Sequence, residues 1–275
     1  MYQMIAFDMD GTLLNSKKQI SPEDRTAITK AFQAGKTVIL NTGRCIAELE
    51  EYIRVIPEVR YLNCSSGAIV YDLREKKILY SALLESEIIK KILDFAALEK
   101  AMPHIMLEKS YIQKNHLEEM ERYGMGGYKM MFERVAEKWD DLAQEYARNA
   151  FLAAKINLYH TDPASRSRTE ARIREAGLDV TMVQAETTAL EISAVGVDKG
   201  SGLEHLCRYI GVPVSQTIVV GDADNDVGAL KKAGLAVAMG NANAAVKGIA
   251  AVYVADCDKN GCAEAIEKYL LHSEI

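Results

Sequence analysis

The first residues of the chain that could do chemistry are two aspartates near its start, Asp8 and Asp10, separated by one methionine. They follow the apolar run Met4–Phe7, which predicts a short buried strand, and they precede Gly11, which predicts the end of that strand. Side chains alternate between the two faces of a strand, so both carboxylates are expected on one side. Neighbouring carboxylates repel each other unless a cation offsets their charge, and Mg²⁺ prefers oxygen ligands. The pair therefore indicates either a nucleophilic aspartate with a proton-transferring neighbour or a solvated turn.

A second acidic segment follows an apolar run at residues 218–220 and carries Asp222, Asp224 and Asp226. This spacing is also that of the first positions of a calcium-binding EF-hand loop. The EF-hand interpretation fails because the sixth position is Val227 instead of Gly and the twelfth is Ala233 instead of Glu. A strand before the segment also disagrees with a helix–loop–helix unit.

Two further segments could hold an anion. Thr42 and Gly43 follow the apolar strand predicted at residues 37–40, and a helix is expected after them, so their hydroxyl and N–H groups could hold a phosphate oxygen at a helix N-terminus. The alternative is a simple helix cap. Arg44 is either a ligand for an anionic substrate or an exposed helix residue. Lys199 opens a predicted helix, where a cation is unfavourable unless it faces phosphate or carboxylates, and the alternative is a surface charge.

The elements that must position these residues alternate between strand and helix in residues 1–83 and 189–275. This alternation predicts an α/β fold with a mostly parallel sheet and helices on both faces. Residues 84–188 do not continue this regular alternation. They contain expected helices and short strands, one of them at residues 128–132, and they predict an α+β insert.

Four segments, at residues 8–12, 42–44, 196–200 and 221–226, resemble in this order the motifs of the haloacid dehalogenase superfamily of phosphohydrolases. Residues 63–72 are similar to the Cof-type branch, whose members carry a large α/β cap domain. Two positions depart from that pattern: Ser66 stands where Asn is usual, and Ala229 with Leu230 replaces the more common Met-Leu pair. The resemblance implies a Rossmann-like catalytic core at residues 1–83 and 189–275 and an inserted cap at 84–188.

The same resemblance implies an Mg²⁺-dependent phosphatase that hydrolyses a small phosphorylated metabolite, such as a sugar phosphate, through an aspartyl-phosphate intermediate. The implied catalytic residues are Asp8, Asp10 and Lys199. The implied phosphate-binding residues are Thr42, Gly43, Arg44, Lys199 and Asn225. The implied metal ligands are Asp8, Asp10, Asp222 and Asp226, with Asp10 acting through its backbone carbonyl.

Three other functions fit parts of the pattern. A phosphomutase shares the acid pair and a similar cap. A non-catalytic phosphate-binding protein could use the same scaffold, since a fold does not fix a function. A signalling receiver domain also uses an aspartate, a threonine and a lysine on a parallel sheet, but it is about half this length and has its phosphoacceptor on an internal strand.

Net charge, apolar stretches and cysteine content indicate which partners and which cellular compartment to expect. The formal net charge of −6 argues against nucleic acid or an anionic membrane as the main partner. No apolar stretch approaches the ~20 residues of a membrane span. The five cysteines form no CxxC pair, which favours free thiols and a cytoplasmic location. We expect a monomer or a homodimer.

Overall fold

The computed structural model describes residues 1–185 and 187–272. They form two compact units, which we describe separately. The core unit contains residues 1–43, 50–81 and those from 197 onward, and the inserted unit contains residues 44–49 and 82–196. The chain therefore enters the inserted unit twice, once for a short segment directly after Gly43 and once for the long insertion.

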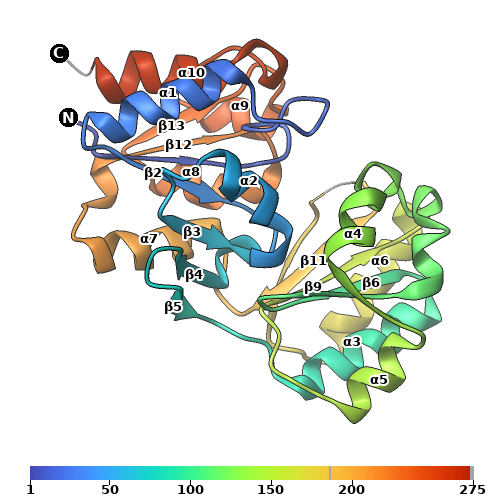
Figure 1. The fold of residues 1–275 in the computed structure, drawn as a ribbon. Coiled ribbons are helices and arrows are strands. Elements are labelled where there is room, and N and C mark those ends of the chain that lie inside the picture. The colour runs from blue at the N-terminus through green and yellow to red at the C-terminus, as the bar shows by residue number, and fades with distance from the viewer. Residues whose placement is uncertain (186, 273–275) are drawn as a thin grey trace. The chain divides into compact units, whose positions relative to one another are not determined.

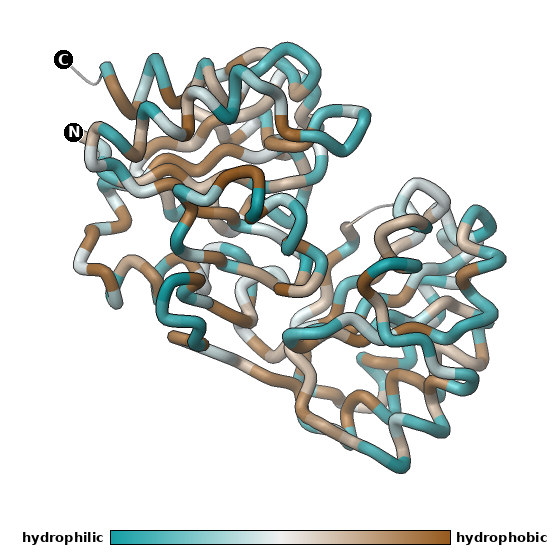
Figure 2. Tube along the Cα trace, in the orientation of Figure 1, coloured by the Kyte–Doolittle hydropathy of each residue, from teal (hydrophilic) through white to brown (hydrophobic). Residues whose placement is uncertain are grey.

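In the described part of the core unit, one sheet has eight strands, of which the first six in spatial order are parallel and the last two antiparallel to their neighbours. Figure 2 shows hydrophobic residues concentrated along the strands of this unit, as expected for a sheet covered on both faces. Across the sheet the strands are β14 (Val252–Tyr253), β13 (Leu235–Ala238), β12 (Thr217–Gly221), β1 (Met4–Phe7), β2 (Thr37–Asn41), β3 (Tyr61–Cys64), β4 (Ile69–Asp72) and β5 (Lys77–Ser81).

Helices in two groups cover this sheet. In Figure 1, α1 (Pro22–Gln33) lies beside α10 (Gly261–Ala265). The second group contains α7 (Lys199–Ile210), α8 (Val227–Lys232) and α9 (Ala244–Ile249). In this group α8 packs against both α7 and α9. The connections from β1 to β2 and from β12 to β13 run in opposite directions along the sheet. Because such connections between parallel strands are right-handed, α1 and α8 are expected to cover opposite faces. The short helix α2 (Glu50–Val55) precedes β3.

The parallel strands bring the predicted site segments to one edge of the sheet. Strands β12, β1 and β2 are neighbours, and Phe7 of β1 is in register with Val220 of β12 and Leu40 of β2. The residues that follow these three strands, which include Asp8, Thr42 and Asp222, therefore leave the sheet at the same edge.

The inserted unit has its own sheet, mostly antiparallel, with three helices packed together and a fourth, α4 (Lys129–Val135), in a separate cluster. Apolar residues such as Ile105 and Ile156 of the sheet pack against α3 and α5 in one hydrophobic cluster. The packed helices are α3 (Ser86–Leu98), α5 (Leu142–Arg148) and α6 (Pro163–Glu175). In spatial order the strands are β10 (Val180–Val183), β11 (Ala189–Ala194), β9 (Lys155–Tyr159), β6 (Met102–Met106), β7 (Ser110–Gln113) and β8 (Ala136–Trp139).

Two expectations about this insertion are wrong. The expected boundary between residues 188 and 189 falls before β11, yet β11 pairs with β9 and β10 because its Leu190 and Ile192 belong to the hydrophobic cluster of the inserted unit. The strand expected at residues 128–132 is a turn followed by α4. In α4 only Phe132 is buried, whereas Met130 is 81% exposed. The helix therefore buries one side, and part of its apolar sequence faces solvent.

Among the described residues, we find no helix long and apolar enough to cross a membrane.

Candidate active site

Three carboxylates from two neighbouring strand ends meet in the core unit. Asp8 follows β1, and Asp222 and Asp226 lie in the loop after β12; one oxygen of each lies within 4.8 Å of the other two. The backbone fixes this approach, because the N–H of Asp8 donates to the carbonyl of Val220 at 3.1 Å. Asp8 and Asp226 are buried, which makes an uncompensated cluster of this kind unfavourable.

The side chain of Asp226 organises its own loop. Its Oδ2 accepts the N–H groups of Asp222 at 2.9 Å and Ala223 at 3.2 Å, while its Oδ1 remains directed at the cluster. Gly221 is required beneath it, since a Cβ there would lie 2.5 Å from the carboxyl carbon of Asp226. Asp224, the third acid of this loop, is exposed and lies outside the cluster.

Lys199 places its ammonium group against the same carboxylates. Its Nζ donates to Oδ1 of Asp8 at 2.6 Å and to Oδ1 of Asp226 at 2.7 Å, and it lies 3.3 Å from Oδ1 of Asn225. The side chain has no exposed surface, so the surface-charge interpretation of Lys199 is wrong. The helix start is held by Asp198, which accepts the N–H of Ser201 at 2.6 Å. The predicted lysine therefore meets both acidic segments.

One lysine does not balance three carboxylates, and the pKa values reflect this. Burial raises the pKa of Asp8 well above its usual range, the charges of Asp226 and Asp222 add to that effect, and Lys199 opposes it. Burial and Asp226 raise the pKa of Asp222 to about 6. Burial alone would lower the pKa of Lys199, but the charges of Asp226 and Asp8 raise it above its usual value. A divalent cation with oxygen ligands fits this excess of negative charge.

Asp10 lies beside this cluster. Its Oδ1 accepts a hydrogen bond from Nζ of Lys18 at 2.7 Å, and its side chain is 25% exposed. The next residue, Gly11, has a left-handed φ of 80°, and a Cβ there would lie 2.4 Å from Oδ2 of Asp222. Thr12 then donates from Oγ1 to Oδ1 of Asp222 at 2.7 Å. The turn after β1 thus packs directly on the loop after β12.

The predicted phosphate-binding segment lies at the end of β2. Thr42 is buried, its N–H donates to the carbonyl of Asn63, and its carbonyl accepts the N–H of Ser66. The expected helix does not start at Thr42: the first helical turn after it is a 3₁₀ turn at Ile46–Leu49, so Thr42 and Gly43 lie in a loop. Any phosphate contact here uses the Thr42 hydroxyl and loop N–H groups without a helix N-terminus.

The structure overturns one of the two interpretations of Arg44, that of an exposed helix residue. It is 7% exposed and is not in a helix. Its guanidinium lies within the inserted unit, 3.2 Å from the sulfur of Met131 and 5.9 Å from the ring centre of Tyr128. Its role as a ligand for an anionic substrate stays a prediction.

Sequence reasoning missed two supports of the site. Asn63 donates from Nδ2 to Oδ1 of Asn41 at 2.6 Å and to the carbonyl of Lys199 at 2.8 Å, which ties the start of α7 to the sheet. A signal was present, because a polar residue interrupts the apolar run of β3. Lys18 was also missed, and no local pattern separates it from its neighbour Lys17.

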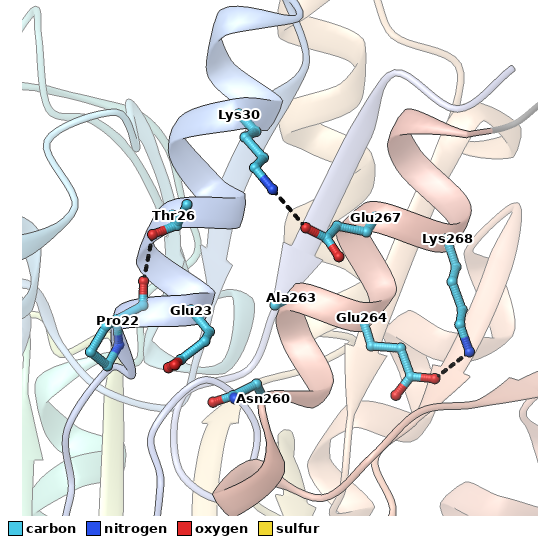
Figure 3. A pocket seen from close by; sticks show the side chains of 9 residues that line it. All are labelled: Pro22, Glu23, Thr26, Lys30, Asn260, Ala263, Glu264, Glu267 and Lys268. Atoms are coloured by element: carbon cyan, nitrogen blue, oxygen red, sulfur yellow. Dashed lines mark hydrogen bonds and ion pairs between the residues drawn. The ribbon is translucent and has the colours of Figure 1, made fainter.

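A groove of about 480 Å³ lies elsewhere in the core unit, between α1 and α10. Figure 3 shows two ion pairs among its charged side chains, Lys30 with Glu267 and Lys268 with Glu264. None of the predicted site residues lines it, so it does not compete with the acidic cluster as the active site. Its lining residues are Pro22, Glu23, Thr26, Lys30, Asn260, Ala263, Glu264, Glu267 and Lys268.

Comparison with known proteins identifies the family of this chain. A family model described as haloacid dehalogenase-like hydrolase matches residues 5–266. Phosphatase YwpJ of Bacillus subtilis (strain 168) is 26% identical over 98% of this chain and 100% of its own length. The 5-amino-6-(5-phospho-D-ribitylamino)uracil phosphatase YcsE of the same organism is 26% identical over 98% of this chain and 96% of its own length. A crystal structure of a haloacid dehalogenase-like hydrolase from Bacteroides thetaiotaomicron matches with a TM-score of 0.84 and 25% sequence identity. The match covers 98% of this chain and 99% of that chain.

The chain therefore belongs to the haloacid dehalogenase-like hydrolases. Within that family it is a Cof-type phosphatase, a hydrolase of phosphoric monoesters.

Proposed function

We propose that this phosphatase hydrolyses a small phosphorylated metabolite in two steps, with Asp8 as the nucleophile and Asp10 as the general acid and base. The observation that carries the proposal is the convergence of Asp8, Lys199, Asp222 and Asp226 in one mostly buried cluster at the ends of neighbouring parallel strands. The match of residues 5–266, which include all of these positions, to the haloacid dehalogenase-like hydrolases supports the proposal.

In the first step, a carboxylate oxygen of Asp8 forms a bond to phosphorus while the bond from phosphorus to the ester oxygen breaks. Asp10 gives its proton to that oxygen, and the alcohol leaves. In the second step, Asp10 takes a proton from water as the water oxygen bonds to phosphorus. The bond to Asp8 breaks, which releases inorganic phosphate and restores the carboxylate of Asp8 and the proton of Asp10.

Donors around the cluster would hold the other phosphate oxygens, where the transition state carries its charge. Lys199 supplies a buried ammonium, and Asn225 lies 3.3 Å from it. At the end of β2, Thr42 would supply its hydroxyl and Gly43 its N–H group, since the N–H of Thr42 donates to the carbonyl of Asn63. The ammonium of Lys199 would also stabilise the charge on Asp8 when phosphate leaves.

The acids are suited to hold Mg²⁺, with the carboxylates of Asp8, Asp222 and Asp226 and the backbone carbonyl of Asp10 as its ligands. When bound, Mg²⁺ supplies positive charge that neutralises the phosphate oxygens and the carboxylates. The raised pKa values of Asp8 and Asp222 support this assignment, because burial and the neighbouring carboxylates both make their charges unfavourable and a bound cation would offset them.

The substrate class rests on relatives and on the insertion. YcsE is named for a small phosphorylated metabolite, and this chain covers 96% of its length. The insertion adds a second folded unit with a sheet of its own. We propose small phosphate esters, with sugar phosphates as the first class to examine.

A panel of phosphate esters, assayed for phosphate release with Mg²⁺ and with EDTA, tests the proposal. We expect Mg²⁺-dependent turnover of at least one small ester and its loss in Asp8→Asn. Full activity of Asp8→Asn contradicts the nucleophile. Transfer of phosphate to a second sugar hydroxyl without phosphate release indicates a mutase, and binding without turnover indicates a non-catalytic protein.

A further inference from the structure

An ion pair links the proposed acid and base to a lysine that no motif singles out. Nζ of Lys18 lies 2.7 Å from Oδ1 of Asp10, and both side chains are partly exposed, at 38% and 25%. We propose that Lys18 is a positioning residue for catalysis, which fixes one oxygen of Asp10 so that the other faces the reacting atoms. This inference rests on the proposed function, since it needs Asp10 to transfer protons.

Hydrogen bonds within the loop at residues 15–19 restrain the backbone at Lys18. The N–H of Lys18 donates to the carbonyl of Asn15 at 2.8 Å, and Oδ1 of Asn15 accepts the N–H groups of Lys17 and Gln19, both at 3.0 Å. Such a turn, closed by an Asn side chain, restrains the backbone at Lys18. The point from which the Lys18 side chain leaves the backbone is thus fixed.

Lys18 also adopts a backbone conformation that a lysine rarely takes. Its φ is 58°, in the left-handed region that favours glycine. Non-glycine residues in that region persist where surrounding contacts impose it, and they concentrate at functional sites. Here the contacts are those of Asn15 and a 3.4 Å hydrogen bond from the Tyr52 hydroxyl to the carbonyl of Lys18. Asp258 holds the loop further by accepting the N–H of Ser16 at 2.9 Å.

A stabilising role alone does not account for this geometry. Ion pairs between partly exposed side chains contribute little to folding stability. The last torsion of an aspartate side chain is broad, so a carboxylate held at neither oxygen samples many orientations. Proton transfer in both steps needs one oxygen of Asp10 within hydrogen-bond reach of the ester oxygen and then of water. An ammonium that holds the other oxygen reduces this freedom.

The test is a set of variants assayed for kcat and KM on whichever ester the panel identifies. Lys18→Met keeps the length of the side chain and removes the charge. We expect kcat to fall about 10- to 100-fold, the order of loss that misplacement of a catalytic group causes, with KM changed less than about threefold. Lys18→Arg keeps a donor and should recover much of the loss. The neighbouring Lys17→Met is the matched control, because Lys17 is exposed, and it should keep wild-type kinetics.

A double-mutant cycle separates positioning from a general effect of charge. If Lys18 acts through Asp10, Lys18→Met should add little to the loss already caused by Asp10→Asn. Full additivity, or wild-type kcat in Lys18→Met, overturns the inference. Thermal melting of each variant checks that the fold is intact. Loss of activity in Asp8→Asn with no effect of Lys18→Met rejects this inference alone, whereas an active Asp8→Asn rejects the proposed function.

Discussion

The Nζ atom of Lys199 lies 2.6 Å from Oδ1 of Asp8, although 191 positions separate the two residues in the sequence. The same Nζ lies 2.7 Å from Oδ1 of Asp226, and the lysine has no exposed surface. A cation desolvated to this degree is stable only because acids surround it. Asp8, Lys199 and Asp226 thus form one electrostatic unit, and removal of any one of them changes the electrostatic environment of the other two.

Lys199→Met tests this unit. Without the ammonium, three carboxylates share one mostly buried place, and the phosphate oxygens lose a donor. We expect kcat to fall about 100- to 1,000-fold, the range seen when one stabilising donor of a transition state is removed. Phosphate-release assays measure the effect. Lys232→Met is the control, because Lys232 pairs with Glu204 of α7 at the surface and should leave activity unchanged. Activity of Lys199→Met within about threefold of wild type contradicts the assignment.

Asp222→Asn should stabilise the protein when no metal is present. The pKa of Asp222 is raised from 3.8 to about 6. The folded protein therefore binds a proton on the Asp222 carboxylate more tightly than the unfolded chain does. Stability is therefore lost as the pH rises from about 4 to about 6, and at pH 7 the ionised group costs up to about 3 kcal/mol. Asn removes the charge but keeps an oxygen for the Thr12 hydroxyl.

Urea unfolding in EDTA at several pH values measures this difference. We expect Asp222→Asn to exceed wild type by about 1 to 3 kcal/mol at pH 7, with the gap closing below about pH 4. Added Mg²⁺ should then stabilise wild type but not the variant. An Asp222→Asn protein that is less stable than wild type in EDTA at pH 7 would show that the acids are balanced without a metal.

The sequence was sufficient to predict the parts of the site that follow strands. Asp8, Thr42 and Asp222 each come after an apolar run, and parallel strands bring such positions to one edge. That β1 lies between β2 and β12 does not follow from local periodicity, because β12 is far away in the chain. The order of motifs in the family supplied that step.

Features that depend on contacts between distant residues escaped prediction. Asn63 supports the start of α7 through the carbonyl of Lys199, a contact that spans 136 positions. Residues 44–49 pack with the inserted unit although the residues on both sides belong to the core unit. Residues 129–135 form a helix where a strand was expected at residues 128–132; Phe132 is buried in a cluster against which Met131 also packs.

Gly11→Ala should impair activity far more than Gly35→Ala. Both glycines have a left-handed φ, 80° and 73°, so both substitutions strain the backbone by about 1 to 2 kcal/mol. Only at Gly11 would the new Cβ meet another group, 2.4 Å from Oδ2 of Asp222, whereas nothing lies within 4 Å at Gly35. We expect Gly11→Ala to lower kcat/KM at least about 10-fold by displacing that carboxylate, and Gly35→Ala to keep it. Equal activities of the two folded variants would mean that Asp222 tolerates displacement.

Glu48→Gln should weaken the inserted unit, because a buried acid there pairs with a histidine. Oε1 of Glu48 lies 3.2 Å from Nε2 of His104, and Oε2 accepts the N–H of Cys45 at 3.1 Å. Burial raises the pKa of Glu48, but His104, Arg44 and the Cys45 N–H together lower it below its usual value of 4.5. The stabilisation is therefore complete above pH 4.5 and is lost as the pH falls below it.

At pH 7 we expect Glu48→Gln to cost about 1 to 3 kcal/mol, the usual effect of leaving a buried charged group without its partner. Glu50→Gln is the matched control, since Glu50 is exposed and pairs only loosely with Arg54 at 3.6 Å, so it should change stability by less than about 0.5 kcal/mol. Urea unfolding at pH 7 and near pH 4 measures both variants. A cost for Glu48→Gln that stays constant with pH, or equals that of Glu50→Gln, would show that the buried pair with His104 contributes no charge-dependent stability.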